Sequence, residues 1–124
     1  MGVSTVRVFI VDDYEPWRRF VCSVLQKRPE LEIVGEVADG LEAVQRAGEL
    51  HPDVILLDIG LPSLNGIEAA RRLRRISPHS KILFVSQESS TEVVQEALNT
   101  GACGYVVKSN ATDLLRGVNA LLVT

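Results

Sequence analysis

The sequence has 124 residues, of which 46% are hydrophobic and 23% are charged, and its formal net charge at pH 7 is −3. This length predicts one domain, residues 1–124, that buries about two-thirds of its unfolded surface. No apolar run approaches the roughly 18 to 20 residues of a membrane helix, and Arg7 interrupts the short apolar stretch near the N-terminus. We therefore expect a cytoplasmic chain without a membrane span, and the net acidity gives no reason to expect nucleic-acid binding.

Short runs rich in β-branched residues alternate along the chain with stretches whose apolar residues recur every three or four positions. This alternation predicts five βα units. The expected strands are 6–11, 33–37, 54–57, 82–85 and 105–107, and the expected helices are 16–27, 41–49, 66–76, 91–99 and 111–122. The run 54–57 is continuously apolar, which favours a central strand buried on both faces. Right-handed crossovers then favour an α/β fold with a doubly wound parallel sheet.

Four pairs of residues predict helix N-termini, because each places a capping side chain three positions before an acid. The pairs are Asp39 with Glu42, Asn65 with Glu68, Ser89 with Glu92, and Asn110 with Asp113. Glycines indicate where two helices should end, at Gly48 and Gly101.

Polar side chains stand at the ends of four expected strands. These are Asp12 and Asp13 after 6–11, Asp58 after 54–57, Ser86 after 82–85, and Lys108 after 105–107. The carboxyl ends of parallel strands share one edge of a sheet, where ligands bind, so we expect these groups to lie together. Three carboxylates, a hydroxyl and an ammonium are the groups needed for metal-assisted transfer of a phosphoryl group to a carboxylate.

The adjacent carboxylates of Asp12 and Asp13 repel each other unless a cation neutralises them. Mg²⁺ fits best, because it is bound through one or two carboxylates and takes its other ligands from water and phosphate. A simpler alternative is that Asp13 only caps the first helix. Gly60, in the loop after Asp58, allows close backbone approach, and its carbonyl could face the metal.

Lys108 is either a surface cation or the partner of Asp58, which it would exchange for a phosphoryl oxygen when the site is loaded. Ser86 is either a turn residue or a donor to a phosphoryl oxygen that draws its loop inward. Tyr105 is either a half-buried strand aromatic or a side chain whose rotamer changes together with that loop.

The whole chain resembles the response-regulator receiver domain of two-component signalling. The resemblance rests on the ordered landmarks in five βα units and on the segment Gly-Ala-Cys-Gly-Tyr-Val-Val-Lys at 101–108. It implies a flavodoxin-like strand order 2-1-3-4-5, with Asp58 as the acceptor of a phosphoryl group from a histidine kinase. It also implies a Mg²⁺ site in which Asp13, Asp58 and the Gly60 carbonyl are direct ligands and Asp12 acts through a water of the metal. Lys108 would contact the phosphoryl group. Ser86 and Tyr105 would form the switch pair.

The segment 108–115 resembles receivers of the subfamily with a helix-turn-helix, LuxR-type output domain, which implies control of transcription. No such domain is present, so the chain is either an excised receiver, which we favour, or a stand-alone regulator. We expect phosphorylation to promote a homodimer through the surface of 91–99, 105–107 and 111–122.

Two other functions remain open, a phosphorylation-independent interaction module and a magnesium-dependent phosphatase. A phosphatase of the Asp-nucleophile kind needs Asp-x-Asp on one strand, which this chain lacks, so we expect no turnover of a separate substrate. Ser109 stands where many receivers have proline, and a cis bond before a non-proline residue costs about 3 to 4 kcal/mol. A trans peptide between Lys108 and Ser109 is therefore the default, although a functional site can hold the strain of a cis bond, so the sequence leaves the isomer open.

Overall fold

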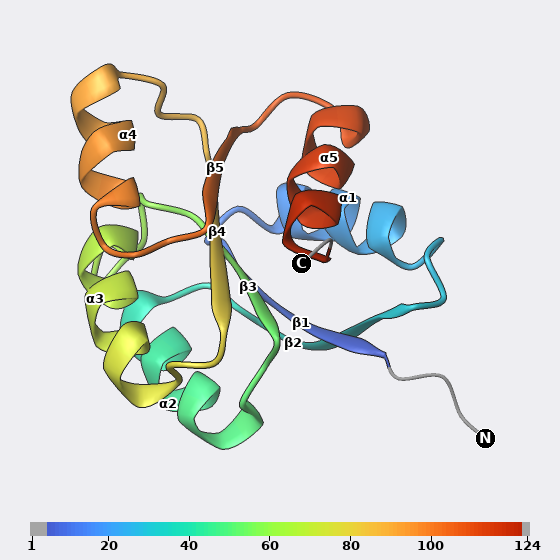
Figure 1. Ribbon diagram of the computed structural model, residues 1–124, viewed down its shortest axis with the longest axis horizontal. Helices are drawn as coiled ribbons and strands as arrows, with labels where there is room; N and C mark the ends of the chain where they lie inside the picture. Colours follow the sequence, from blue (N-terminus) through green and yellow to red (C-terminus); the bar gives the residue numbers. More distant parts are fainter. Residues whose placement is uncertain (1–4, 123–124) are drawn as a thin grey trace.

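The computed structural model describes residues 5–122, in which strands and helices alternate in five βα units (Figure 1). The strands are β1 (Val6–Val11), β2 (Leu31–Val37), β3 (Val54–Leu57), β4 (Lys81–Ser86) and β5 (Gly104–Val107). The helices are α1 (Glu15–Leu25), α2 (Gly40–Leu50), α3 (Gly66–Ile76), α4 (Thr91–Leu98) and α5 (Ala111–Leu122). All neighbouring strands pair in parallel, in the order β2-β1-β3-β4-β5, which confirms the predicted fold class.

The helices cover both faces of the sheet, with α1 and α5 on one face and α2, α3 and α4 on the other (Figure 1). Each face has its own apolar core, and all four residues of β3 are buried between the two cores. This explains why β3 is continuously apolar, since a strand covered on both faces has no side exposed to water. No helix in the range 5–122 combines the length and the apolarity needed to cross a bilayer.

Three of the four predicted helix caps are confirmed, and the fourth is wrong by one residue. Side chains of Asp39, Asn65 and Asn110 each accept a backbone N–H from the first turn that follows. At α4 the cap is Ser90, not Ser89, and its hydroxyl accepts the N–H of Val93 at 3.3 Å. The helix begins at Thr91, and only the residue directly before it can reach the free amides of its first turn.

The predicted end of α2 at Gly48 is also wrong, because the helix continues to Leu50 and ends at His51, which has φ 47°. A Cβ on Gly48 would lie 3.3 Å from Ile76 Cγ2, so this glycine lets α2 pack closely on α3. Gly101, with φ 96°, follows α4 as expected for a helix stop. The remaining differences are shifts of one or two residues at the ends of α1, α2, α4, β2, β4 and β5.

Candidate functional site

The pairing of β1 with β3 places the acidic residues beside one another. Val11 and Leu57 are partners in the register of these strands, so Asp12 and Asp58 follow at the same level. The backbone N–H of Asp58 donates to the Val11 carbonyl at 3.0 Å, which continues the ladder to the edge of the sheet. The two carboxylates are therefore fixed by strand geometry rather than by flexible loops.

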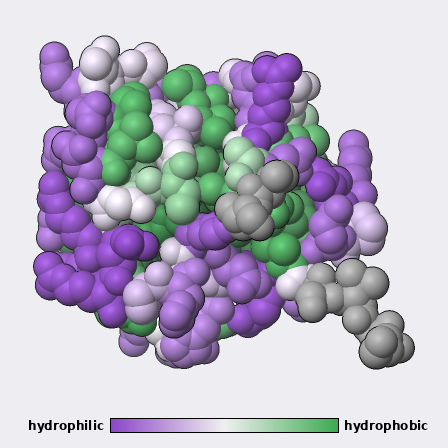
Figure 2. All heavy atoms as spheres, viewed as in Figure 1, coloured by the Kyte–Doolittle hydropathy of each residue, from purple (hydrophilic) through white to green (hydrophobic). Residues whose placement is uncertain are grey.

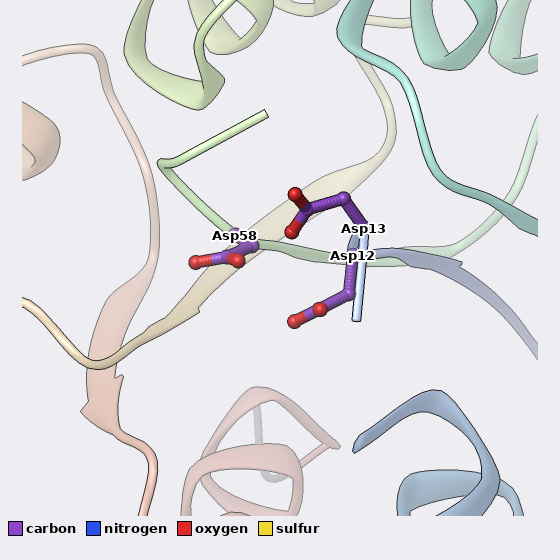
Figure 3. A group of neighbouring side chains, drawn as sticks. All are labelled: Asp12, Asp13 and Asp58. Atoms are coloured by element: carbon purple, nitrogen blue, oxygen red, sulfur yellow. The ribbon is translucent and has the colours of Figure 1, made fainter. Parts of the chain in front are cut away.

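Asp12, Asp13 and Asp58 form a compact acidic cluster (Figure 3). One carboxylate oxygen from each residue lies within 4.8 Å of the others. Asp12 and Asp58 are buried, with 1% and 7% of their surfaces exposed, whereas Asp13 is exposed. Burial raises the pKa of Asp12 above its ordinary value, against the lowering effect of hydrogen bonds from Lys108 and the Tyr14 amide. Oxygen ligands at this spacing, partly desolvated, suit a small hard cation.

The alternative role of Asp13 as a helix cap is not realised. The N-cap residue of α1 is Tyr14, and its side chain makes no capping hydrogen bond. Asp12 instead accepts the N–H of Tyr14 at 2.8 Å through Oδ1, which fixes its carboxylate in the turn after β1. The Asp13 carboxylate is thus left to face the solvent side of the cluster.

Lys108 directly follows β5 and reaches the acidic cluster across the edge of the sheet. Its Nζ lies 2.7 Å from Asp12 Oδ2 and 3.3 Å from Asp58 Oδ2, and only 9% of its side chain is exposed. The predicted contact with Asp58 is present, but the closer partner is Asp12. The described residues contain no cis peptide bond, so the bond from Lys108 to Ser109 has the default trans form.

Ser86 and Tyr105 both contact the loop after β4. Ser86 ends that strand with 3% of its surface exposed, and its hydroxyl accepts the N–H of Glu88 at 3.2 Å. The Tyr105 hydroxyl donates to the Glu88 carbonyl at 2.7 Å, and its ring stacks on Phe84 with centroids 6.0 Å apart. Burial raises the pKa of Tyr105, so the phenol is the donor in this contact. The same loop residue therefore connects the two predicted switch residues.

A hollow of about 520 Å³ opens beside the acidic cluster. It is lined by Asp13, Tyr14, Asp58, Gly60, Ser86, Gln87, Glu88 and Lys108. A Cβ on Gly60 would meet nothing within 4 Å, so packing does not require glycine there, and the metal-facing role of its carbonyl stays a prediction. Carboxylates, a hydroxyl and an ammonium therefore line the same small volume.

The loop between β3 and α3 packs directly against the Asp58 backbone. The Asp58 Oδ1 accepts the N–H of Ile59 at 2.8 Å, and Gly66 donates its N–H to the Ile59 carbonyl at 2.7 Å. A Cβ on Gly66 would lie only 1.9 Å from the Asp58 carbonyl oxygen. Glycine at the start of α3 is thus a condition for the position of Asp58.

Two residues of α1 support the site that sequence reasoning did not single out. Arg18 donates from Nη1 to the Asp12 carbonyl at 2.7 Å and lies 3.5 Å from the Glu36 carboxylate through Nε. The ring centroid of Trp17 lies 5.5 Å from Lys108 Nζ. Their position one turn after the acid pair was the available signal, but only the packing of α1 shows what they touch.

A comparison with protein families matches the chain to the response regulator receiver domain over residues 8–119. DevR/DosR of Mycobacterium tuberculosis, a DNA-binding transcriptional activator, is 41% identical over 114 residues, which are 91% of this chain and 52% of that protein. The transcriptional regulatory protein DegU of Brevibacillus brevis is 38% identical over 112 residues, which are 90% of this chain and 48% of DegU. The chain therefore spans about half the length of these curated relatives.

Solved structures agree with this match. The response regulator domain of Thermotoga maritima CheB superposes with a TM-score of 0.87 at 34% identity, covering 97% of this chain and 98% of that one. The signal receiver domain of NarL from Mycobacterium tuberculosis superposes with a TM-score of 0.90 at 28% identity, covering 98% and 100%. The family match, the sequence relatives and the shared fold together show that this chain belongs to the response regulator receiver domains.

Proposed function

We propose that Asp58 is the phosphoacceptor of this receiver domain and that a histidine kinase supplies the phosphoryl group. The observation that carries the proposal is that the Asp58 carboxylate lies within 4.8 Å of the acid pair after β1 and 3.3 Å from the ammonium of Lys108. The hollow beside this carboxylate offers space for a phosphoryl group, and Ser86 and Lys108 are among the residues that line it.

In the proposed reaction a carboxylate oxygen of Asp58 attacks the phosphorus of the donor. The new O–P bond forms as the bond from phosphorus to the donor's leaving atom breaks, and the leaving group departs with that electron pair. Lys108 offers positive charge to the phosphoryl oxygens, because its contact with Asp58 at 3.3 Å is long enough to be exchanged for a closer one. The chain thus modifies itself once rather than turning over a separate substrate.

The acidic cluster fits Mg²⁺, with Asp13 and Asp58 as direct ligands, the Gly60 carbonyl as a further one, and Asp12 acting through water. Bound there, Mg²⁺ would offset the repulsion between the incoming phosphoryl oxygens and three carboxylates. Asp12 is held by Lys108 and by the Tyr14 amide, which suits an indirect role. Asp13 is exposed and free of a capping contact, which suits a direct one.

Incubation with acetyl phosphate and Mg²⁺, followed by intact mass measurement, tests the proposal. The expected result is a lasting gain of one phosphoryl group. No gain is expected when EDTA is present during the incubation, and none is expected in the Asp58→Asn variant. Continuous release of inorganic phosphate would support the phosphatase alternative, and no mass change would support a phosphorylation-independent module. Labelling of Asp58→Asn at the unsubstituted level would refute the assignment of the acceptor.

Ser86 and Tyr105 are the proposed switch pair. The Ser86 hydroxyl accepts the Glu88 amide, which leaves its own O–H free to donate to a phosphoryl oxygen. A shift of Ser86 toward that oxygen would pull on the Glu88 amide, and Tyr105 is bonded to the carbonyl of the same residue. Movement of this loop would therefore reach Tyr105. Ser86→Ala should still be phosphorylated but should lose the coupling, so full chemical-shift changes in α4 on adding beryllofluoride to this variant would exclude the relay.

The expected output is a change in protein contacts that controls a transcription-regulating domain. DegU and DevR/DosR, which are about twice as long as this chain, are by name a transcriptional regulatory protein and a transcriptional activator. Figure 2 shows apolar side chains gathered between α4 and α5, where β5 forms the edge of the sheet, and 42% of Val107 is exposed there. A homodimer through α4, β5 and α5 would cover them, and phosphorylation should shift the dimer equilibrium by about 1 to 3 kcal/mol. Identical sedimentation with and without beryllofluoride would contradict the dimer. Tight binding of duplex DNA at physiological salt would contradict an output through protein contacts alone.

A further inference from the structure

Trp17 is the only tryptophan of the chain, and it lies against the phosphoacceptor site without lining its hollow. It belongs to the first turns of α1, which begins at Glu15 immediately after the acid pair. The ring packs on Phe20, one turn further along, with centroids 5.1 Å apart and planes tilted by 38°. This contact within the helix holds the indole in place.

The ammonium of Lys108 lies over the face of this ring, 5.5 Å from its centroid. This is within the roughly 6 Å over which an aromatic face attracts a cation. With 9% of the Lys108 side chain exposed, little water competes for the ammonium, and its other close partners are Asp12 and Asp58. Indole is the most strongly attracting of the aromatic side chains, and the attraction grows when the cation is desolvated.

We propose that Trp17 is a positioning residue that holds the Lys108 ammonium at Asp58 for the incoming phosphoryl group. The inference rests on the proposed function. The two carboxylates that hold Lys108 also have to serve the metal ion, and Asp58 has to attack the phosphorus. The ring carries no formal charge, so it attracts the ammonium without neutralising it. Trp17 therefore remains a partner of Lys108 while the contacts to Asp12 and Asp58 are exchanged.

Trp17 also has a packing role that the test must separate. Together with Val21, Leu56 and Val85 it borders a small space beneath the site, so truncation would disturb the core as well as the ammonium. A purely structural contribution would be the same whether or not position 108 carries a cation. A contribution through the ammonium would vanish once the cation is removed.

A double-mutant cycle with Trp17→Leu and Lys108→Met makes this separation. The rate of Asp58 labelling by acetyl phosphate should fall about fivefold in Trp17→Leu and about twofold in Trp17→Phe, which keeps a ring. Adding Trp17→Leu to Lys108→Met should lower the rate no further. The unfolding equilibrium constant, measured in EDTA without donor, should change more for Trp17→Leu when Lys108 is present than in Lys108→Met, where only the loss of packing remains. Equal effects of Trp17→Leu in both backgrounds would overturn the inference.

Fluorinated tryptophan provides a second test that leaves the core volume nearly unchanged. Because the chain has one tryptophan, biosynthetic incorporation alters this ring alone. Each added fluorine weakens the negative face of the ring, so the labelling rate should fall stepwise with fluorine number, and should not do so in Lys108→Met. Rates independent of fluorination, with the ordinary chain fully labelled, would refute this inference alone. Failure to label the ordinary chain would instead refute the proposed function on which it rests.

Discussion

Replacing Gly66 by alanine should displace Asp58 and thereby lower both stability and phosphorylation. Gly66 is the first residue of α3, and a Cβ there would lie 1.9 Å from the Asp58 carbonyl oxygen and 2.8 Å from Ile59 Cα. Both obstacles are backbone atoms, so no side-chain rotation can relieve the overlap. Either the end of β3 or the start of α3 must move.

The size of the effect follows from that overlap. Ordinary van der Waals contact for a Cβ begins at 3.4 Å, so one of the two backbones must retreat by about 1.5 Å. Overpacking of this kind costs about 1 to 3 kcal/mol, and a clash between two backbones belongs at the upper end of this range. A displacement of about 1 Å at a reacting group lowers a rate about 100-fold. We therefore expect a free energy of unfolding lower by about 3 kcal/mol and a labelling rate lower by about 100-fold.

Urea unfolding and the rate of labelling by acetyl phosphate measure the two effects. Gly48→Ala is the matched control, because its Cβ would meet only Ile76 Cγ2, at 3.3 Å, and alanine gains about 1 kcal/mol of helix propensity over glycine. The control should keep nearly the stability and rate of the unsubstituted chain. A Gly66→Ala variant with unchanged unfolding and an unchanged rate would refute the reasoning.

The remaining predictions concern three other side chains. Burial holds the pKa of Asp12 above its ordinary value, so its ionised form opposes folding, and Asp12→Asn should unfold at higher urea than the unsubstituted chain at pH 7 in EDTA. This advantage should disappear below about pH 4, where the carboxyl is protonated in both states, and an advantage independent of pH would contradict the assignment. Tyr105→Phe removes the bond to the Glu88 carbonyl and should cost about 1 kcal/mol in urea unfolding while leaving the labelling rate of Asp58 within twofold, or about 0.4 kcal/mol, of normal. Burial raises the pKa of Cys22 to about 11, so iodoacetamide at pH 8 should alkylate the exposed Cys103 first, and peptide mass analysis showing equal rates would exclude this.

Local pattern was sufficient to predict the elements, their order and the residues at the strand ends. The period of the apolar residues distinguishes strands from helices within a few positions, and the unbroken run in β3 reports burial on both faces. Parallel strands then oblige Asp12 and Asp58 to meet, because their carboxyl ends share one edge. The roles assigned to these residues remain proposals, although the structure brings them together.

The sequence alone could not decide contacts whose partners are distant along the chain. Glycine at position 48 is a local signal for a helix end, but Gly48 lies inside α2, where it packs against α3. Ser89 and Ser90 are equivalent as local capping signals, and the point where α4 leaves the loop selects Ser90. For Gly48 the packing of α3 decided the outcome, and for Ser90 the position of the first turn of α4 decided it.

The surroundings of Lys108 show most clearly what required the tertiary structure. Its identity and its place after β5 were evident, but its closer contact with Asp12 and the ring of Trp17 beneath it depend on how α1 packs beside the edge of the sheet. Periodicity states which face of a helix is buried, not which side chain of another element it meets. The sequence by itself determined the groups available at the site, and the packing of α1 against the sheet decided which of them touch, because those contacts join segments that only the folded chain brings together.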